Sequence, residues 1–241
     1  MGWEVCLAGD AADLGMLAGS FTGPDFAISK SGDEFLLTSP EFEALNAADK
    51  IRDRAVVFIE LLNGAARLAL ESRTPVAIVG VNRRHPNGGR DVVVFAEPGV
   101  FHCRLLAPSL TVTHLDGSTE TYHPADPIRD WINLASTDNA VKTTLKLLSS
   151  GVWDWVNLYR VLDVVTSDCE GLEKIEANGW ATTTAMRLFK HTSGSPGAVG
   201  KEARHGAEST MPPPKPMSLP EAKSLVLGIV QSWLCAKVTA P

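Results

Sequence analysis

The chain has 241 residues, of which 44% are apolar and 21% are charged, and its formal net charge at pH 7 is -6. This composition excludes wholesale disorder and provides enough apolar side chains for the cores of two domains. The acidic balance argues against a protein whose whole surface binds nucleic acid, so a basic site must be local.

The first part of the chain predicts strands around one long helix. The segment 3–9 has the apolar and β-branched mix of a strand, and 26–39 predicts two strands around the turn at Gly32. Ser39 and Pro40 are typical of a helix start, and apolar residues recur at helical spacing from there to residue 66. We expect this helix to pack on the sheet, with Asn63-Gly64 as its end or a kink.

The strand pattern returns at Pro75. Residues 76–81 and 90–97 predict a hairpin with a basic loop, and 101–107 predicts a further strand. The segments 110–115 and 118–123 flank Asp116-Gly117, which is a strong hairpin signal.

Helical patterns follow the prolines at 124 and 127. We expect helices over 125–136, 137–150, 152–168, 172–191 and 218–234. Gly151 is a natural left-handed helix stop. The last helix has the clearest start, because Ser218 and Glu221 match a capping box.

These elements predict an α+β fold with two domains. Residues 1–124 form an α+β domain with a mostly antiparallel sheet and one long helix, and residues 125–241 form an all-α helical bundle.

The four cysteines are far apart and form no C-x-x-C pair, which indicates buried thiols in a reducing compartment. The opening residues lack the basic and apolar regions of a secretory signal, and no stretch approaches the roughly 18 apolar residues of a membrane helix. The common nucleotide, hydrolase and zinc motifs are absent from the sequence. We therefore expect a cytoplasmic protein that has no membrane segment, no cofactor and no metal.

The stretch from Arg187 to Gly206 concentrates basic residues around a glycine-rich turn. These residues are Arg187, Lys190, His191, Lys201, Arg204 and His205. An imidazole, with a reference pKa of about 6.5, exchanges protons near neutrality, and a guanidinium can hold a phosphate through two parallel hydrogen bonds. The stretch therefore predicts a phosphate site.

Each candidate residue can be given a role in such a site. The predicted catalytic residues are Arg204, His205, His191 and Asp163, and the predicted phosphate-binding residues are Arg187, Lys190, Lys201 and Arg160. Asp163 and Arg160 lie on the preceding helix and would orient the other groups. A structural alternative also fits these residues, because basic side chains near a helix C-terminus stabilise the negative end of the helix dipole or tie a loop to a carboxylate.

Other residues suggest weaker sites. The hairpin loop with Arg83, Arg84, His85 and Arg90 is a candidate phosphate contact, but a basic hairpin tip is more typical of solvated charge. A metal site from His102, His114 and His123 would need the fold to gather them. Trp153 and Trp155 are alternatives as base-stacking platforms, and the apolar stripe of Trp155 favours the core.

The order of LYRVLD, then FKHTSGSPGAVGKEARHG, then PMSLPEAKSLVLGIVQSWL, over about residues 126–241, resembles helical domains of bacterial proteins that are similar to the HEPN superfamily. This resemblance implies small helical RNases of toxin and phage-defence systems, which often assemble their sites across a dimer. Their motif has Arg, four to six residues and then His; here Arg187 and His191 are separated by three residues and Arg204-His205 by none. Arg204 and His205 are the positions that the resemblance matches.

Two functions follow as expectations. The first is a binding or interaction protein of a bacterial stress or phage-defence system, with a basic phosphate-binding turn that contacts RNA or another phosphate-containing ligand and with a protein partner. The second is a metal-independent RNase that uses Arg204 and His205. The missing spacing favours the first, and a homodimer is expected in either case.

Overall fold

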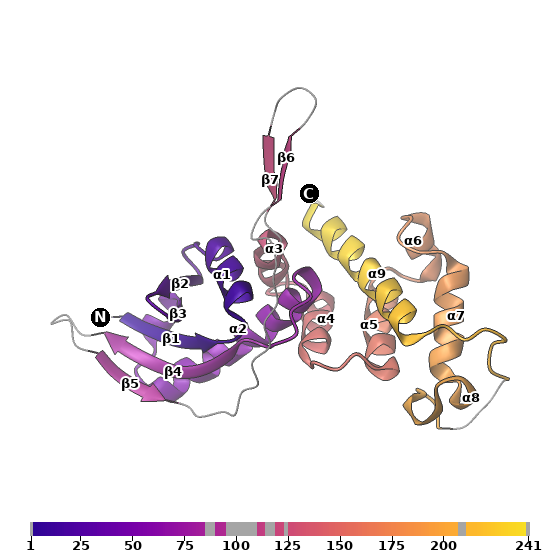
Figure 1. Cartoon of the computed structure of the whole chain (residues 1–241), viewed down its shortest axis with the longest axis horizontal. Coiled ribbons are helices and arrows are strands. Elements are labelled where there is room, and N and C mark those ends of the chain that lie inside the picture. Colours follow the sequence, from indigo (N-terminus) through magenta and orange to yellow (C-terminus); the bar gives the residue numbers. More distant parts are fainter. Residues whose placement is uncertain are drawn as a thin grey trace. The chain divides into compact units, whose positions relative to one another are not determined.

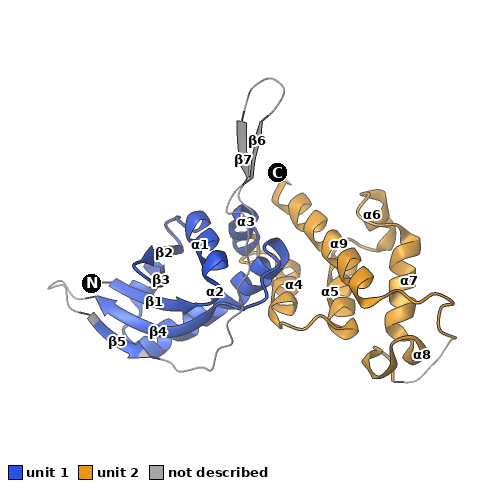
Figure 2. Cartoon of the chain, in the orientation of Figure 1, with its two compact units in different colours: residues 1–133 blue, residues 134–241 orange. Residues whose placement is uncertain are grey.

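The computed structural model describes residues 2–84, 90–94, 110–113, 119–122, 125–206 and 211–239. The chain forms two compact units, Met1–Asn133 and Leu134–Pro241 (Figure 2). The fold is α+β, as predicted: a sheet lies in the first unit, and the second unit is built from helices (Figure 1).

Unit 1 contains an antiparallel sheet with the strand order β2-β3-β1-β4-β5. Its elements are β1 (Gly2–Ala8), α1 (Ala11–Ser20), β2 (Ala27–Ser31), β3 (Glu34–Thr38), η1 (Pro40–Ala44), α2 (Ala48–Ala69), β4 (Ala77–Arg84), β5 (Arg90–Val94), β6 (Leu110–Thr113), β7 (Thr119–Tyr122) and α3 (Asp126–Leu134). The predicted hairpins are confirmed as the pairs β2–β3, β4–β5 and β6–β7. Gly32 has a φ of 61°, which suits a residue without a side chain. Residues 101–107 and the turn at Asp116-Gly117 lie outside the described residues.

The predicted long helix is divided into two elements. Ser39 accepts a hydrogen bond from the N–H of Glu41 and Pro40 opens the helix, but η1 is a short 3₁₀ turn, and α2 starts only at Ala48. The α2 helix packs against β4 and β1 and runs through Asn63 without a break. The Asn63 side chain links α2 to the residue before β4. Its amide donates to the carbonyl oxygen of Val76 (2.9 Å) and accepts from the N–H of Val76 (2.7 Å).

The division between the units falls in the last turn of α3. Most of α3 belongs to unit 1, and it contacts the end of α1 and the residue that follows it. Arg129 lies over the ring of Phe21, and the Ser20 hydroxyl donates to Asp126 (3.2 Å). The proline-marked division predicted after residue 124 precedes this helix.

Unit 2 is a helical assembly centred on α5, which packs against α4, α7 and α9. Its elements are α4 (Asn139–Ser149), α5 (Trp155–Asp168), α6 (Leu172–Ala177), α7 (Thr183–Gly194), α8 (Pro196–Val199), η2 (Gly200–Glu202) and α9 (Leu219–Thr239). Gly151 has a φ of 84° after the end of α4, as expected of a left-handed stop. The helix predicted over 172–191 is interrupted after Ala177, where Gly179 has a φ of 73°.

The α9 helix anchors the second unit. Its capping box is confirmed, because Glu221 accepts from the N–H of Ser218 (2.8 Å) and the Ser218 hydroxyl accepts from the N–H of Glu221 (3.4 Å). Trp233 is 1% exposed, and its indole N–H donates to Asp168 at the end of α5 (2.8 Å). Lys237 forms ion pairs with Asp168 and with Asp138, which caps α4.

Candidate functional site

The C-terminal end of α7 holds the pair Arg204-His205. The N–H of Arg204 donates to the carbonyl oxygen of Ser193 (2.8 Å), which fastens the turn after η2 onto the helix. A Cβ atom at Gly194 would lie 3.2 Å from Cδ2 of His205, closer than ordinary contact. The missing side chain at position 194 therefore lets the imidazole ring lie against the end of α7.

The Arg204 side chain lies on an aromatic ring. Its guanidinium carbon is 4.0 Å from the centroid of the Tyr159 ring on α5, and its Nη1 is 3.4 Å from Nε2 of His205. The ammonium of Lys190 is 5.9 Å from the same ring centroid. The structure thus places Arg204 and Lys190 at the Tyr159 ring and His205 beside Arg204, and we call Lys190, Arg204, His205 and Tyr159 the Tyr159 cluster.

The aromatic support beneath this cluster is buried. The rings of Tyr159 and Phe189 are stacked at 6.3 Å, and those of Trp155 and Phe189 at 6.1 Å. Phe189 is 0% exposed and Trp155 is 5% exposed, whereas Arg204 and His205 are exposed. The core position expected for Trp155 is confirmed, and the rings provide a rigid base for the exposed cations.

Arg204 makes no ion pair with a carboxylate among the described residues. A guanidinium that stacks through its face keeps its N–H groups in the plane, where they can bind an anion. The position at the end of α7 also has a structural benefit, because cations there stabilise the negative end of the helix dipole. The geometry serves both purposes: Arg204 is held by a ring through its side chain and by Ser193 through its backbone, and no carboxylate of the described residues pairs with it.

His191 lies in the last turn of α7, and its side chain bonds to the segment that precedes α9. Its Nε2 is 2.8 Å from the carbonyl oxygen of Met211, and because a carbonyl only accepts, the imidazole donates this hydrogen bond. The neighbouring Thr192 hydroxyl accepts from the N–H of Met217 (3.1 Å). These two residues tie the segment that leads into α9 to the end of α7.

The remaining predicted residues lie around the Tyr159 cluster or apart from it. Lys201 is exposed in η2, and Arg160 is exposed on α5. Arg187 is exposed on α7 near Glu176. Hydrogen bonds from the Thr183 hydroxyl and N–H lower the pKa of Glu176, and the charge of Arg187 contributes less.

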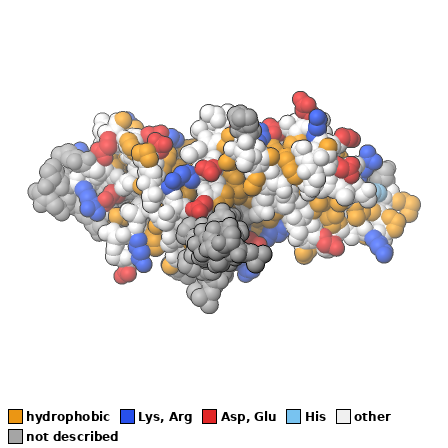
Figure 3. Space-filling model, turned by 90° about the horizontal axis from the view of Figure 1, so that it is seen from above, with side chains coloured by type: hydrophobic (Ala, Val, Ile, Leu, Met, Phe, Trp, Pro, Cys, Tyr) orange, Lys and Arg blue, Asp and Glu red, His pale blue; other side chains and the backbone are white. Residues whose placement is uncertain are grey.

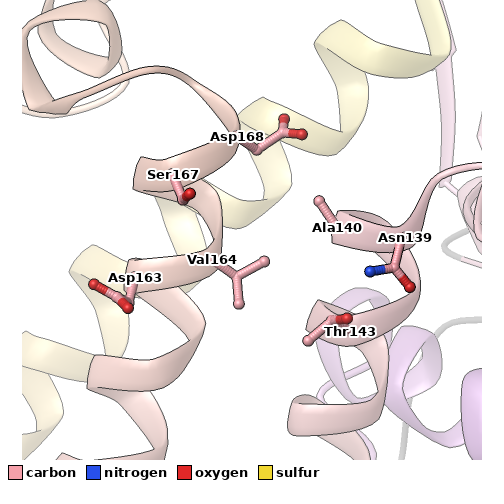
Figure 4. A pocket seen from close by; sticks show the side chains of 7 residues that line it. All are labelled: Asn139, Ala140, Thr143, Asp163, Val164, Ser167 and Asp168. Carbon is pink, nitrogen blue, oxygen red and sulfur yellow. The ribbon is translucent and has the colours of Figure 1, made fainter.

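Asp163 lines an open groove of about 410 Å³ between α4 and α5 (Figure 4). The other polar side chains of this groove are those of Asn139, Thr143, Ser167 and Asp168. Among the described residues, the structure shows no contact of Asp163 with His205 or His191. At about 100° per residue, the α5 residues that line the groove lie between roughly 40° (Asp163) and roughly 180° (Asp168) around the helix axis from Tyr159, so the groove extends away from the cluster.

The weaker sequence candidates have structural explanations or lie outside the described residues. Arg83 lies over the ring of Trp3, and Arg84 forms an ion pair with Glu4 (2.7 Å). Lys223 lies over the ring of Trp153. His85, His102, His114 and His123 are outside the described residues. Within the described ranges, no group of three or more His, Cys, Asp or Glu residues is arranged to hold a metal ion.

Basic and acidic side chains are mixed on the surface of the molecule. On the face seen in Figure 3, Lys and Arg side chains are interspersed with Asp and Glu side chains. This mixture agrees with a local basic site rather than a uniformly basic surface. In the part of the chain that the structure describes, every helix is too short or too polar to span a bilayer.

Comparisons of the chain with protein-family models, curated proteins and solved structures give no match. The HEPN resemblance therefore stays a prediction from the sequence, and the functional argument depends on the site alone.

The sequence pattern missed the role of Tyr159. Tyr159 follows Trp155 by four residues and shares its apolar stripe, which is typical of a core residue. The available signal was the presence of Tyr159 on a helix expected to pack near the basic turn, because an aromatic face is a common support for Arg.

Proposed function

We propose that the protein binds RNA through the basic turn of unit 2, as a binding and interaction protein of a bacterial stress or phage-defence system. The observation that carries this proposal is the position of the Arg204 guanidinium, 4.0 Å from the Tyr159 centroid and without a carboxylate partner among the described residues. An exposed cation that is already fixed in place loses little conformational entropy when it binds a phosphate.

The neighbouring cations supply the rest of the phosphate site. His205 lies beside Arg204, and Lys190 lies beside the same ring. Lys201 is exposed on the same turn and adds positive charge to the approach of an anion. Arg204 provides two parallel N–H groups for one phosphate, and Lys190 and His205 contact its remaining oxygens or the next phosphate.

A metal-independent RNase is the second candidate, and the 3.4 Å separation of Arg204 and His205 favours it. In this reaction His205 would remove the proton of the 2′-hydroxyl, and Arg204 would stabilise the charge that develops on the phosphate. A second proton-transfer group is needed for the leaving oxygen. Of the two other candidates, His191 donates its hydrogen bond to Met211 and Asp163 lines the groove between α4 and α5. Among the described residues neither shows a contact with His205, so the geometry supports binding more than cleavage.

The test measures RNA binding and cleavage with the same protein samples. Fluorescence anisotropy with a labelled single-stranded RNA should show binding by the wild type, weaker binding by Arg204→Ala, and a steeper loss with salt for the wild type than for the variant. The control is Lys174→Ala, which removes an exposed positive charge from α6, at the other end of α7. It should bind as the wild type does.

A gel of total RNA incubated with wild type and His205→Ala in EDTA decides between the two functions. Intact RNA with both samples supports a binding protein. Cleavage by the wild type alone would establish the RNase. Wild-type protein that is folded by circular dichroism and binds no RNA would refute the proposal.

The homodimer and the protein partner stay predictions. Light scattering during size-exclusion chromatography measures the first directly, and a value for a single chain at high concentration would reject it.

A further inference from the structure

The Tyr159 cluster presents a flat cationic surface, not only a positive charge. The rings of Trp155, Phe189 and Tyr159 are near-parallel, with interplanar angles of 30° and 21° at the two contacts. The Arg204 guanidinium carbon lies 4.0 Å from the centroid of the last ring of this series, well within the roughly 6 Å over which a ring face attracts a cation. The series therefore runs from the core of unit 2 to an exposed plane.

A guanidinium has two faces, and a single aromatic ring such as that of Tyr159 can cover at most one of them. Arg204 is exposed, and its side-chain contact with His205 is made through Nη1 at the edge of the guanidinium. The outer face is therefore available for another planar group. A nucleobase is such a group, and RNA-binding proteins commonly stack unpaired bases on arginine planes.

We propose that the site binds an unpaired nucleotide of single-stranded RNA, with its base stacked on the outer face of Arg204 and its phosphate held by Lys190 and His205. This inference rests on the proposed function and specifies its ligand. In duplex RNA the bases are already paired and stacked, so a duplex offers the cluster phosphates alone.

The experiment compares two ligands that have the same charge. One is a single-stranded RNA of about ten nucleotides, which is within the range of single-stranded binding sites. The other is an abasic chain of the same length and the same number of phosphates. The wild type should bind the intact RNA about tenfold more tightly, because the stacking of one base contributes on this scale.

Arg204→Lys distinguishes attraction of phosphate from base stacking, because lysine keeps the positive charge and lacks the planar guanidinium group. This variant should bind the abasic chain more weakly than the wild type, because it loses the two parallel N–H groups, but it should keep measurable binding through its charge. It should bind the intact RNA no more tightly than the abasic chain. A 2-aminopurine base in the oligonucleotide reports stacking directly. Its fluorescence should fall on binding to the wild type and should change less with Arg204→Lys.

The outcomes distinguish this inference from the function on which it rests. Equal wild-type affinities for the intact and abasic chains would overturn base stacking and leave phosphate binding in place. Binding of neither chain would overturn both. Loss of all binding by a folded Arg204→Lys variant, with tight binding of the abasic chain by the wild type, would assign Arg204 to phosphate alone and also overturn the inference.

Discussion

The guanidinium carbon of Arg204 lies 4.0 Å from the centroid of the Tyr159 ring, although the two residues are on separate segments of unit 2. This contact explains how a turn can hold an exposed cation in one place, although no carboxylate of the described residues pairs with it. It also makes the position sensitive to the packing of α5 and α7, which supply Tyr159 and Phe189.

Gly194→Ala should weaken RNA binding about two- to tenfold, which corresponds to the loss of one typical hydrogen bond. The new Cβ atom would lie 3.2 Å from Cδ2 of His205, so the exposed imidazole must move away from the end of α7. Anisotropy with single-stranded RNA measures the effect.

The matched control for this change is Gly206→Ala, since a Cβ atom at position 206 would meet no atom of the described part of the chain within 4 Å. It should keep wild-type affinity. Equal affinities for Gly194→Ala and the wild type would show that the position of His205 contributes nothing to binding.

Trp233→Ala should lower the free energy of unfolding by about 3–5 kcal/mol, because it removes a large buried side chain. The indole is 1% exposed and also donates a hydrogen bond to Asp168. Urea denaturation followed by circular dichroism measures the loss. Trp233→Phe, which keeps an aromatic ring and loses the N–H donor, should fall between the wild type and the Ala variant; a loss below about 1 kcal/mol for the Ala variant would contradict the anchoring role of α9.

Lys237 and Asp138 should make the stability of unit 2 depend on pH. Burial alone would raise the pKa of Asp138, but hydrogen bonds from Lys237 and from the N–H groups of Val141 and Ala140 outweigh it and lower this pKa. Burial alone would lower the pKa of Lys237, and its hydrogen bonds to Asp138 and Asp168 raise it.

The signs of these shifts define the pH window. The contribution of Asp138 is present above the ordinary carboxyl pKa of about 4 and is lost as the pH falls through its lower folded value. The contribution of Lys237 is present below the ordinary lysine pKa of about 10.4 and is lost as the pH rises through its higher folded value.

Lys237→Met should therefore cost about 1–3 kcal/mol near neutral pH and less near about pH 3. Urea denaturation of both proteins at the two pH values gives the difference. A cost that stays the same at low pH would exclude the ion pair as its source.

Asn63→Ala should destabilise unit 1 by about 1–3 kcal/mol, because it leaves the N–H and the carbonyl of Val76 without the side chain that pairs with both. Thermal unfolding of this variant is compared with that of Asn46→Ala, a change at an exposed side chain. Similar melting temperatures for the two variants would contradict the bracing role of Asn63.

Local sequence signals predicted much of the fold because they act over a few residues. The Gly32 turn, the Gly151 stop and the Ser218–Glu221 capping box are all found as predicted. The α1 helix was not predicted, because the short segment after Asp10 follows a strand directly and only the Asp10 side chain, which accepts from the N–H groups of Ala12 and Asp13, marks its start.

The division of the expected long helix depends on packing rather than on local preference. Ser39 and Pro40 give a valid helix start, but η1 ends after one turn, Leu45 has extended backbone angles, and its carbonyl accepts the indole N–H of Trp3 (3.0 Å). A contact between residues 42 positions apart cannot be read from local periodicity.

The sequence shows which basic residues lie in the turn, but not which residues their side chains contact. The basic turn was evident from Arg204 and His205, whereas the support of Arg204 by Tyr159 and the tie of His191 to Met211 are contacts between separate segments. Asp163 shows the same limit, because helical spacing places it on α5 but does not determine which neighbouring helix it faces.

The most direct test of the central claim is the affinity of a labelled single-stranded RNA for wild type, Arg204→Ala and Lys174→Ala at low ionic strength. The account predicts binding by the wild type and Lys174→Ala, and about tenfold or greater loss for Arg204→Ala with folding retained. Equal affinities of the three proteins, or no binding by the folded wild type, would contradict an RNA site at the Tyr159 cluster.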